Sequence, residues 1–263
     1  MLLRNVFGAT LWEARRSLFG WIVAMAGVTF MYSAAYRSLA KGKASVIDGY
    51  PESLRKAFNL EDFGSPAGYL GSTVFGLLLL LLVTVYVIIT GTRAIAGDEE
   101  SGLLDLLLAH PISRRRLLLE RMAAMMAVLV AMGVVVLLVL LAIRGPGKLT
   151  VDPAKLAAMT LQWVLLGCCL GSLTLLVGAA TGRRSVTIGT SVVVALTGYL
   201  ADSFLPQIKG LGWIRHLSPY HWYTGGEPLR NGLQLGGCGL LIGVTVLALA
   251  AAVVLLDRRD INV

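Results

Sequence analysis

The chain has 263 residues, of which 56% are hydrophobic and only 14% charged, and its mean hydropathy is +0.76. A water-soluble domain is usually nearer roughly 45–50% apolar and about 25% charged, so this composition excludes an ordinary soluble fold. The net charge of +8 comes from basic residues beside long apolar runs, where lysine and arginine anchor spans against anionic lipid headgroups. This distribution indicates membrane lipid as a partner and argues against nucleic acid.

The three cysteines offer no metal site or disulfide framework. Cys168, Cys169 and Cys238 all lie in or beside apolar runs, without CxxC spacing and without a histidine nearby in sequence. Small apolar side chains in packed helices are the simpler interpretation. No cofactor or metal site is expected in this chain.

The hydropathy pattern predicts an all-α polytopic membrane protein with six transmembrane helices. Residues 1–16 have apolar positions at helical spacing and Trp12 for the headgroup region, which favours an amphipathic surface helix. The alternative is that they form the first turns of span 1. Each predicted span has the roughly 20 apolar residues that a crossing needs. The predicted spans are 17–36, 68–92, 117–143, 156–180, 185–205 and 236–256.

Six crossings place both termini on one side of the membrane. Lysine and arginine are about equally numerous on the two sides, so their total does not decide the orientation. Every adjacent arginine cluster, however, lies on the side of the termini and next to a span end. We therefore expect both termini in the cytoplasm of a bacterial cell, with the chain in the cell membrane. The clusters are Arg15-Arg16, Arg114 to Arg116, Arg183-Arg184 and Arg258-Arg259.

Glycines recur at four-residue spacing in two spans, at Gly167 and Gly171 and at Gly239 and Gly243. Such spacing lets helix backbones approach closely in lipid. It indicates helix packing, of which a dimer interface is one possibility.

The segment between spans 2 and 3 does not fit a plain membrane bundle. Its acidic start suits the first turn of a helix, where carboxylates meet the positive end of the macrodipole. Leucines then follow at helical spacing, Pro111 ends the helix, and Ser113 can cap the next one. This predicts a short cytoplasmic helix over 97–110, which either docks on a partner or lies on lipid. The acidic positions are Asp98, Glu99 and Glu100, and the leucines are Leu103, Leu104, Leu107 and Leu108.

The helix that begins after Ser113 is longer than a membrane crossing requires. A helix over 114–143 would be about 45 Å long, against a hydrocarbon core of about 30 Å. We therefore expect its first turns, with Arg114, Arg115 and Arg121, to project into the cytosol.

Here the sequence resembles a known family. The stretch Asp98-Glu-Glu-Ser-Gly-Leu-Leu-Asp-Leu-Leu-Leu-Ala-His-Pro-Ile-Ser-Arg114 is similar to the acidic, glycine and leucine motif between spans 2 and 3 of ABC-2-type ABC transporter permeases. Leu217-Ser-Pro-Tyr-His-Trp-Tyr223 is similar to the family's Leu-Ser-Pro and aromatic motif before the last span. The six spans and the charged C-terminal end agree over the whole chain.

The resemblance implies a division of labour. Residues 97–110 would be a coupling helix seated on a separate ATPase subunit, which binds the ATP and Mg, and a second or homologous permease would complete the transporter. The expected contact residues are Asp98, Glu99, Glu100, Leu103, Leu104, Leu107, Leu108, Arg114 and Arg115. The implied function is export of a lipophilic or amphipathic substrate such as a drug, antibiotic, peptide or lipid.

No catalytic motif accompanies this pattern. The phosphate-binding GxxxxGK[ST] loop is absent, so the chain is not expected to be an enzyme by itself. An intramembrane enzyme of the CAAX type would need an arginine four residues after its glutamate pair, where this chain has Leu104. A secondary transporter would usually carry ionisable residues inside its spans, and spans 2, 4 and 6 lack them.

The segment 203–235 combines helix-breaking prolines with aromatic residues that suit a membrane interface. We expect a pair of short re-entrant or surface helices on the outer side, capping the transport path; the alternative is ordinary aromatic anchoring. The candidate outer-gate residues are Trp213, Pro219, Tyr220, Trp222 and Tyr223.

Overall fold

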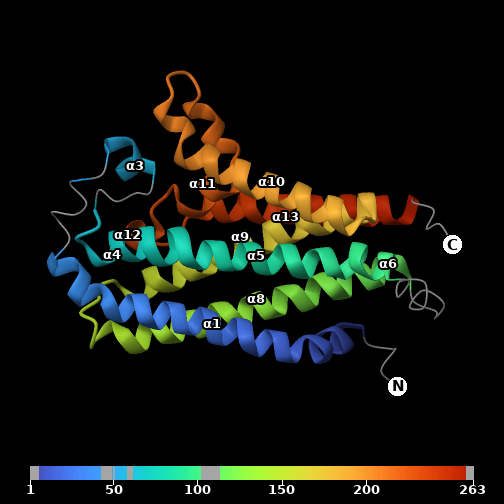
Figure 1. Cartoon of the computed structure of the whole chain (residues 1–263), viewed down its shortest axis with the longest axis horizontal. Coiled ribbons are helices and arrows are strands. Elements are labelled where there is room, and N and C mark those ends of the chain that lie inside the picture. The colour runs from blue at the N-terminus through green and yellow to red at the C-terminus, as the bar shows by residue number, and fades with distance from the viewer. Residues whose placement is uncertain (1–5, 43–48, 50, 58–61, 102–112, 259–263) are drawn as a thin grey trace.

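The computed structural model describes residues 6–42, 49, 51–57, 62–101 and 113–258. In these residues the regular structure is helical throughout, and six helices are long and apolar enough to cross a membrane, which confirms the all-α polytopic prediction. Figure 1 shows them side by side along the long axis. The six crossing helices are Arg15–Tyr36, Pro66–Glu100, Arg114–Arg144, Pro153–Thr181, Arg184–Gln207 and Leu235–Arg258.

The first span belongs to one continuous helix, α1 (Val6–Gly42). The described residues of the N-terminal segment are therefore the first turns of the span-1 helix. The prediction of a separate surface helix is wrong for these residues, because the helical backbone continues into span 1 without a break.

The second span is assembled from several helical registers. It begins with α4 (Pro66–Tyr69) and passes through the π-helix η2 (Leu70–Leu78) into α5 (Leu79–Thr92). A second π-helix, η3 (Arg93–Gly97), then leads into α6 (Asp98–Glu100). This helix therefore runs further than the predicted 68–92. Short π-helical segments are rare and occur frequently at functional sites.

Local signals in the sequence explain the ends of α8 (Arg114–Arg144) and α9 (Pro153–Thr181). Ser113 Oγ accepts the Arg116 N–H at 3.3 Å, so the predicted N-cap of α8 is confirmed. Asp152 caps α9 through the Ala154 N–H at 2.8 Å, with proline at the first helical position. Gly182 ends α9 in the left-handed conformation with φ 61°, which glycine adopts without strain.

The central helix of the bundle is α9. It packs against α5, α8, α10 (Arg184–Ser203) and α13 (Leu235–Arg258). Of the most apolar 18-residue stretch of α9, two-thirds of the residues are buried, against 17% for the corresponding stretches of α1 and α10. A Cβ on Gly167 would lie 2.9 Å from Val83 and 3.0 Å from Leu129, so glycine permits this close approach. A Cβ at Gly239 or Gly243 would meet nothing within 4 Å, so the second glycine pair lies outside these contacts.

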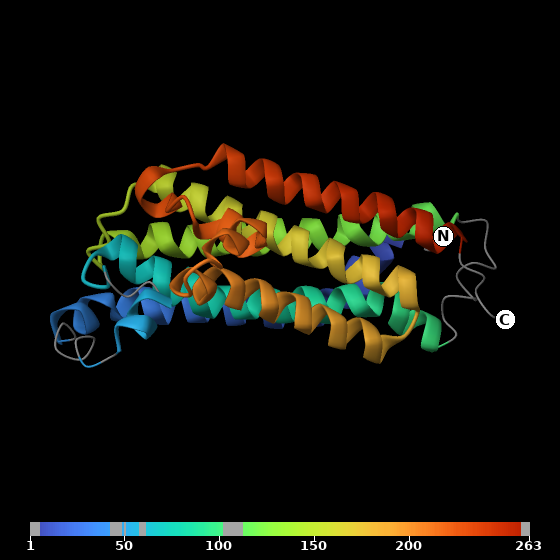
Figure 2. The ribbon, with the colours of Figure 1, turned by 90° about the horizontal axis from the view of Figure 1, so that it is seen from above.

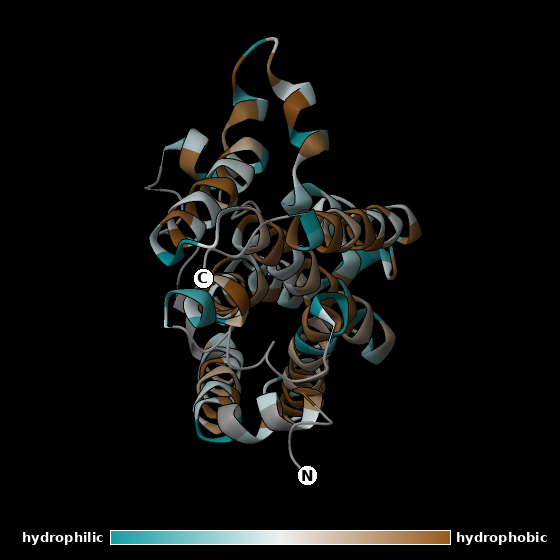
Figure 3. Cartoon of the chain, turned by 90° about the vertical axis from the view of Figure 1, so that its right-hand side faces the viewer, coloured by the Kyte–Doolittle hydropathy of each residue, from teal (hydrophilic) through white to brown (hydrophobic). Residues whose placement is uncertain are grey.

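The outer surface of the bundle is apolar. Phe19 on α1, Val193 on α10 and Leu247 on α13 are 61–71% exposed, as expected for side chains that face lipid. Figure 3 views the bundle along its length and shows hydrophobic positions along the span helices. All three cysteines are buried and free.

Four short helices fill the region between α10 and α13. Figures 1 and 2 show this region at the end of the bundle away from α6. The elements are the 3-10 helices η4 (Leu205–Gln207) and η5 (Gly212–Leu217), then α11 (Pro219–Thr224) and α12 (Pro228–Asn231). A further short helix, α3 (Glu52–Ala57), lies between spans 1 and 2.

Candidate functional site

Two ends of the bundle carry the residues that the sequence singled out. The terminal end holds the starts of α1, α8 and α10 and the ends of α6, α9 and α13; Figures 1 and 2 show the described chain ends there. The opposite end, called the α11 end, holds η4, η5, α11 and α12.

Arg121 joins α8 to the end of the second span. Its guanidinium forms an ion pair with the Asp98 carboxylate and donates a hydrogen bond to the Ala94 carbonyl, and the side chain is only 8% exposed. A cation at a helix C-terminus satisfies carbonyls that have no partner within the helix. The first turns of α8 thus pack against their neighbours, and the projection of these turns into the cytosol stays a prediction.

Carboxylates occupy the N-terminal ends of two other helices. Glu100 accepts the Arg184 N–H at 2.8 Å, at the start of α10. Glu120 accepts the Phe7 N–H at 3.0 Å, at the start of α1, and pairs with Arg116 at 2.6 Å. Both contacts place a negative charge where the helix macrodipole is positive. They connect α6 to α10 and α8 to α1.

The last span is held at the same end by two arginines of α8. Arg114 donates to the Leu256 carbonyl at 3.2 Å, near the C-terminus of α13. Arg115 pairs with Asp257 at 2.5 Å. The start of α8 therefore contacts α1, the second span and α13 through polar side chains.

These contacts change the expected start of the coupling helix. Asp98, Glu99 and Glu100 form the last turn of the second-span helix, where they were expected in the first turn of a new one. The reason is that α5 continues through η3 without a break, and Arg121 offsets the negative charge at this C-terminus. Leu103, Leu104, Leu107 and Leu108 lie outside the described residues, so the helix expected over 97–110 stays a prediction beyond Ser101.

A cavity of about 290 Å³ opens between α1, the second-span helix and α8 near the terminal end. Its lining includes the charged residues Arg93, Asp98 and Arg121 and the apolar residues Met125 and Val128. Sequence reasoning missed this cavity because its lining comes from four helices that are far apart along the chain, α9 contributing Leu175.

The α11 end places the five predicted outer-gate residues in two environments. Tyr220 and Tyr223 are buried at 4% and 1% exposure, whereas Trp213 is 63% exposed. Pro219 begins α11, whose N-cap Ser218 also donates its hydroxyl to the Gly198 carbonyl at 2.7 Å. Trp222 donates its indole N–H to the His216 carbonyl at 2.7 Å. The segment is thus built from short helices in contact with α9, α10 and α13.

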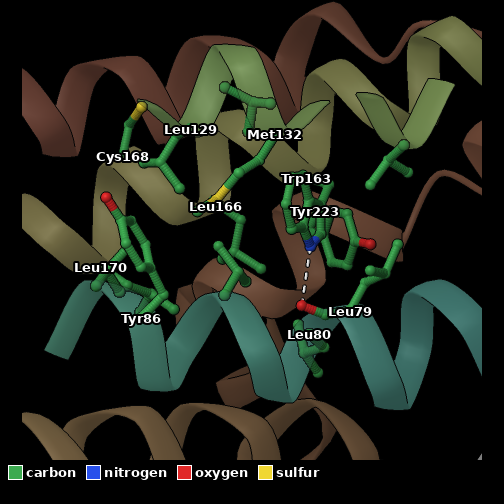
Figure 4. Packing of buried hydrophobic residues seen from close by; sticks show 14 of the residues in the cluster. Leu79, Leu80, Tyr86, Leu129, Met132, Trp163, Leu166, Cys168, Leu170 and Tyr223 are labelled. Carbon is green, nitrogen blue, oxygen red and sulfur yellow. Dashed lines mark hydrogen bonds between the residues drawn. The ribbon is translucent and has the colours of Figure 1, made fainter. Parts of the chain in front are cut away.

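Two aromatic residues donate hydrogen bonds to the second-span backbone. Tyr223 donates its hydroxyl to the Phe75 carbonyl at 3.2 Å, and Trp163 on α9 donates its indole N–H to the Leu79 carbonyl at 3.1 Å. Figure 4 shows the Trp163 bond among the buried side chains, with Tyr223 nearby. Leu79 itself bonds to Val74, five residues back, at the change from π- to α-helix. A change from five-residue to four-residue hydrogen bonds leaves one backbone carbonyl without a partner in the helix, here that of Phe75.

Asp202 and His221 form a pair that the sequence did not predict. Asp202 on α10 lies 3.2 Å from His221 Nδ1 on α11, 19 residues later, beside a cavity of about 250 Å³. Burial lowers the pKa of His221 below its ordinary value of 6.5, although the attraction of Asp202 acts in the opposite direction. The lowered pKa favours a neutral imidazole at neutral pH. In the described residues, no group of three or more metal-ligating side chains is assembled.

The comparison with known families agrees with this architecture. A family model described as ABC-2 family transporter protein matches residues 5–261 of the chain. A comparison with curated proteins finds no match. The family match includes all six crossing helices, the charged terminal end and the α11 end. The chain is therefore a multi-pass membrane protein that belongs to the ABC-2 family of transporter proteins.

Proposed function

We propose that this chain is the transmembrane permease subunit of an ATP-driven exporter in a bacterial cell membrane. A separate ATPase subunit would dock at the terminal end, which would face the cytoplasm with both chain termini. A second copy of the chain, or a homologous permease, would complete the transport path. Membership of the ABC-2 family over residues 5–261 supports this assignment.

The observation that carries the proposal is the set of polar contacts around the two ends of the 102–112 segment. Glu100, just before this segment, contacts the start of α10. Arg114 and Arg115, just after it, contact the end of α13, and Glu120 contacts the start of α1. A force applied by an ATPase between residues 97 and 115 would therefore reach four or more spans through direct bonds. ATP binding would shift the population between two arrangements of the bundle.

The ATPase contact would be formed by Asp98, Glu99, Glu100 and the four leucines of the predicted coupling helix, together with Arg114 and Arg115. The α11 end would then form the outer gate. The buried Tyr220 and Tyr223 would hold α11 in place, and the exposed Trp213 would lie at the headgroup level on the outer side of the cell membrane.

The exported substrate would be lipophilic or amphipathic, such as a drug, antibiotic, peptide or lipid. The charged side chains of the described residues gather at the ends of the spans and leave the bundle interior largely apolar. Such an interior suits an apolar or amphipathic molecule better than a strongly charged one.

The test is purification of the tagged chain from its native membrane under conditions that preserve complexes. We expect an ATPase subunit with a phosphate-binding loop to co-purify, and inverted vesicles to accumulate substrate only with ATP. Leu104→Asp should remove the ATPase from the complex because it places a carboxylate on the docking face. Leu233→Asp, an exposed leucine at the α11 end, is the matched control and should keep it. A wild-type chain that purifies without any ATPase would overturn the proposal.

A further inference from the structure

The cavity between α1, the second-span helix and α8 is divided into a polar rim and an apolar interior. We define the rim as the charged lining residues Arg93, Asp98 and Arg121, and the exposed Ser17 on α1 also lines the cavity. Leu18, Met125, Val128 and Leu175 line the interior. Because Ser17 and Arg93 are both exposed, the cavity reaches the surface of the bundle.

The charge of the rim is dominated by Arg93. Arg121 is paired with Asp98, so these two charges offset each other. Arg93 is exposed, and its side chain forms no ion pair or hydrogen bond with another residue of the described part of the chain. It therefore adds one uncompensated positive charge beside the cavity. Arg93 also begins the π-helix η3, a local geometry that occurs frequently at functional sites.

Residues on two helices indicate the level in the bilayer at which the rim lies. On α1, the Arg15 guanidinium lies 3.8 Å from the ring centroid of Trp12, and Trp12 is 64% exposed. Exposed tryptophan and arginine side chains of this kind settle at the headgroup level of a bilayer. Leu11 and Leu18, which flank this pair in sequence, both line the cavity. On the second span, Arg93 directly follows the apolar helix α5.

The interior leads from this level toward the middle of the bilayer. Tyr86 lines the cavity seven residues before Arg93, which corresponds to about 10 Å along the helix. Met125 and Val128 follow Arg121 in the same direction along α8. A ligand with its charge at the rim would therefore have its tail parallel to the lipid chains.

From this geometry, we infer that the cavity binds an anionic phospholipid of the leaflet at the terminal end. The phosphate lies against Arg93, whose planar guanidinium can donate two parallel hydrogen bonds to it, and Ser17 also lines the cavity. One acyl chain enters the apolar interior beside Met125 and Val128, and the rest of the lipid remains in the bilayer. Basic pockets between transmembrane helices are suited to such headgroups. The site lies within this single chain and needs no ATPase subunit.

The experiment is native mass spectrometry of the full-length protein in detergent, titrated with phosphatidylglycerol and, separately, with phosphatidylcholine of the same chains. We expect the wild type to retain phosphatidylglycerol roughly tenfold better, the scale of one charge-assisted contact. Arg93→Gln should remove this preference, and Arg93→Lys should keep part of it because the charge remains. Arg183→Gln is the matched control, since Arg183 is an exposed arginine at the same end that does not line the cavity.

Glycerol phosphate and inorganic phosphate distinguish a lipid from a free anion. If the acyl chain contributes, neither should displace phosphatidylglycerol at equal concentration. The inference is overturned if Arg93→Gln keeps the wild-type preference, if phosphatidylcholine binds equally well, or if glycerol phosphate competes fully. Unchanged melting temperatures for the variants show that a lost preference is not a loss of fold. An ATPase partner could be absent and this site still be present, so the two proposals fail separately.

Discussion

Arg121 is the only charged side chain that is buried among the residues the structure describes. Taking a guanidinium out of water is costly unless its charge and its donors are satisfied. Asp98 supplies the opposite charge, and the Ala94 carbonyl accepts a hydrogen bond at the end of the second span. This one residue therefore ties the start of α8 to the end of the second-span helix.

Replacing Arg121 with alanine should decrease the free energy of unfolding by about 3 kcal/mol, because it leaves Asp98 without its partner in a partly buried position. Denaturant titration of the purified protein in mixed micelles measures the change. The double variant Arg121→Ala, Asp98→Ala should recover part of the loss, since it leaves no unpaired carboxylate. Equal stability of the wild type and the single variant would contradict the importance of this pair.

At the α11 end, Asp62 connects the segment before α4 to α12. Its carboxylate accepts a hydrogen bond from Ser65 and forms an ion pair with Arg230. The Ser65 hydroxyl, followed by Arg230, lowers the pKa of Asp62 below its ordinary value of 3.8. A carboxyl with a lowered folded-state pKa stabilises the fold above its ordinary pKa and loses this contribution as the pH falls through the folded-state value.

The stability difference between the wild type and Asp62→Asn should therefore be present at neutral pH and disappear in acid, below pH 3.8. Thermal unfolding in detergent between neutral pH and strong acid measures this. Glu52→Gln serves as control, because Glu52 pairs with Lys56 on an exposed helix and should contribute little at any pH. A difference that stays constant through the acid range would show that the Asp62 charge does not stabilise the fold.

At the scale of elements, the π-helix η2 depends on α11. The change from five-residue to four-residue hydrogen bonds after Val74 passes over the Phe75 carbonyl, and Tyr223 supplies the missing donor. In a membrane bundle no water is present in the hydrocarbon region to replace such a partner. The short helix α11 thus stabilises an irregular part of the second span.

Tyr223→Phe should destabilise the protein by about 1–3 kcal/mol, because it leaves the buried Phe75 carbonyl without this donor while preserving the ring. The amides of residues 70–80 should then exchange faster with deuterium. Trp222→Phe is the matched control, since its bond to the His216 carbonyl is exposed and water can replace it. If exchange in 70–80 is unchanged, η2 does not depend on the tyrosine.

At the scale of the whole molecule, six crossing helices place the described ends of α1 and α13 at the same end of the bundle (Figure 1). Of the arginine clusters at this end, Arg114 to Arg116 is engaged with the C-terminus of α13 and with carboxylates. By the positive-inside preference, the adjacent arginines at this end would place it in the cytoplasm, as proposed above.

Cysteine labelling tests this orientation. The native cysteines Cys168, Cys169 and Cys238 are buried and should react little in the folded protein. Trp213→Cys should react with a membrane-impermeant maleimide in intact cells. Arg258→Cys, at the exposed end of α13, should react only after permeabilisation. The reverse pattern would invert the proposed topology and place the ATPase contact elsewhere.

Much of the fold could be predicted from local patterns. Apolar runs gave all six crossing helices, and Ser113 was recognised as the cap of α8. The acidic turn at Asp98 to Glu100 was misassigned, because its charge pattern suits a helix start. Its stabilisation at a helix end comes from Arg121, more than 20 residues later in the sequence. Local rules cannot include such a partner.

The amino-acid order therefore accounts for the membrane class and the number of spans, because lipid solvation acts on each apolar run separately. The family follows from the sequence motifs. The polar contacts at the terminal end, the Asp202–His221 pair, the Tyr223 bond to η2 and the cavity beside Arg93 depend on the three-dimensional arrangement. Each of them joins helices that are distant along the chain. Which residues meet in these contacts depends on how the helices pack around α9, and helix packing is a property of the assembled bundle.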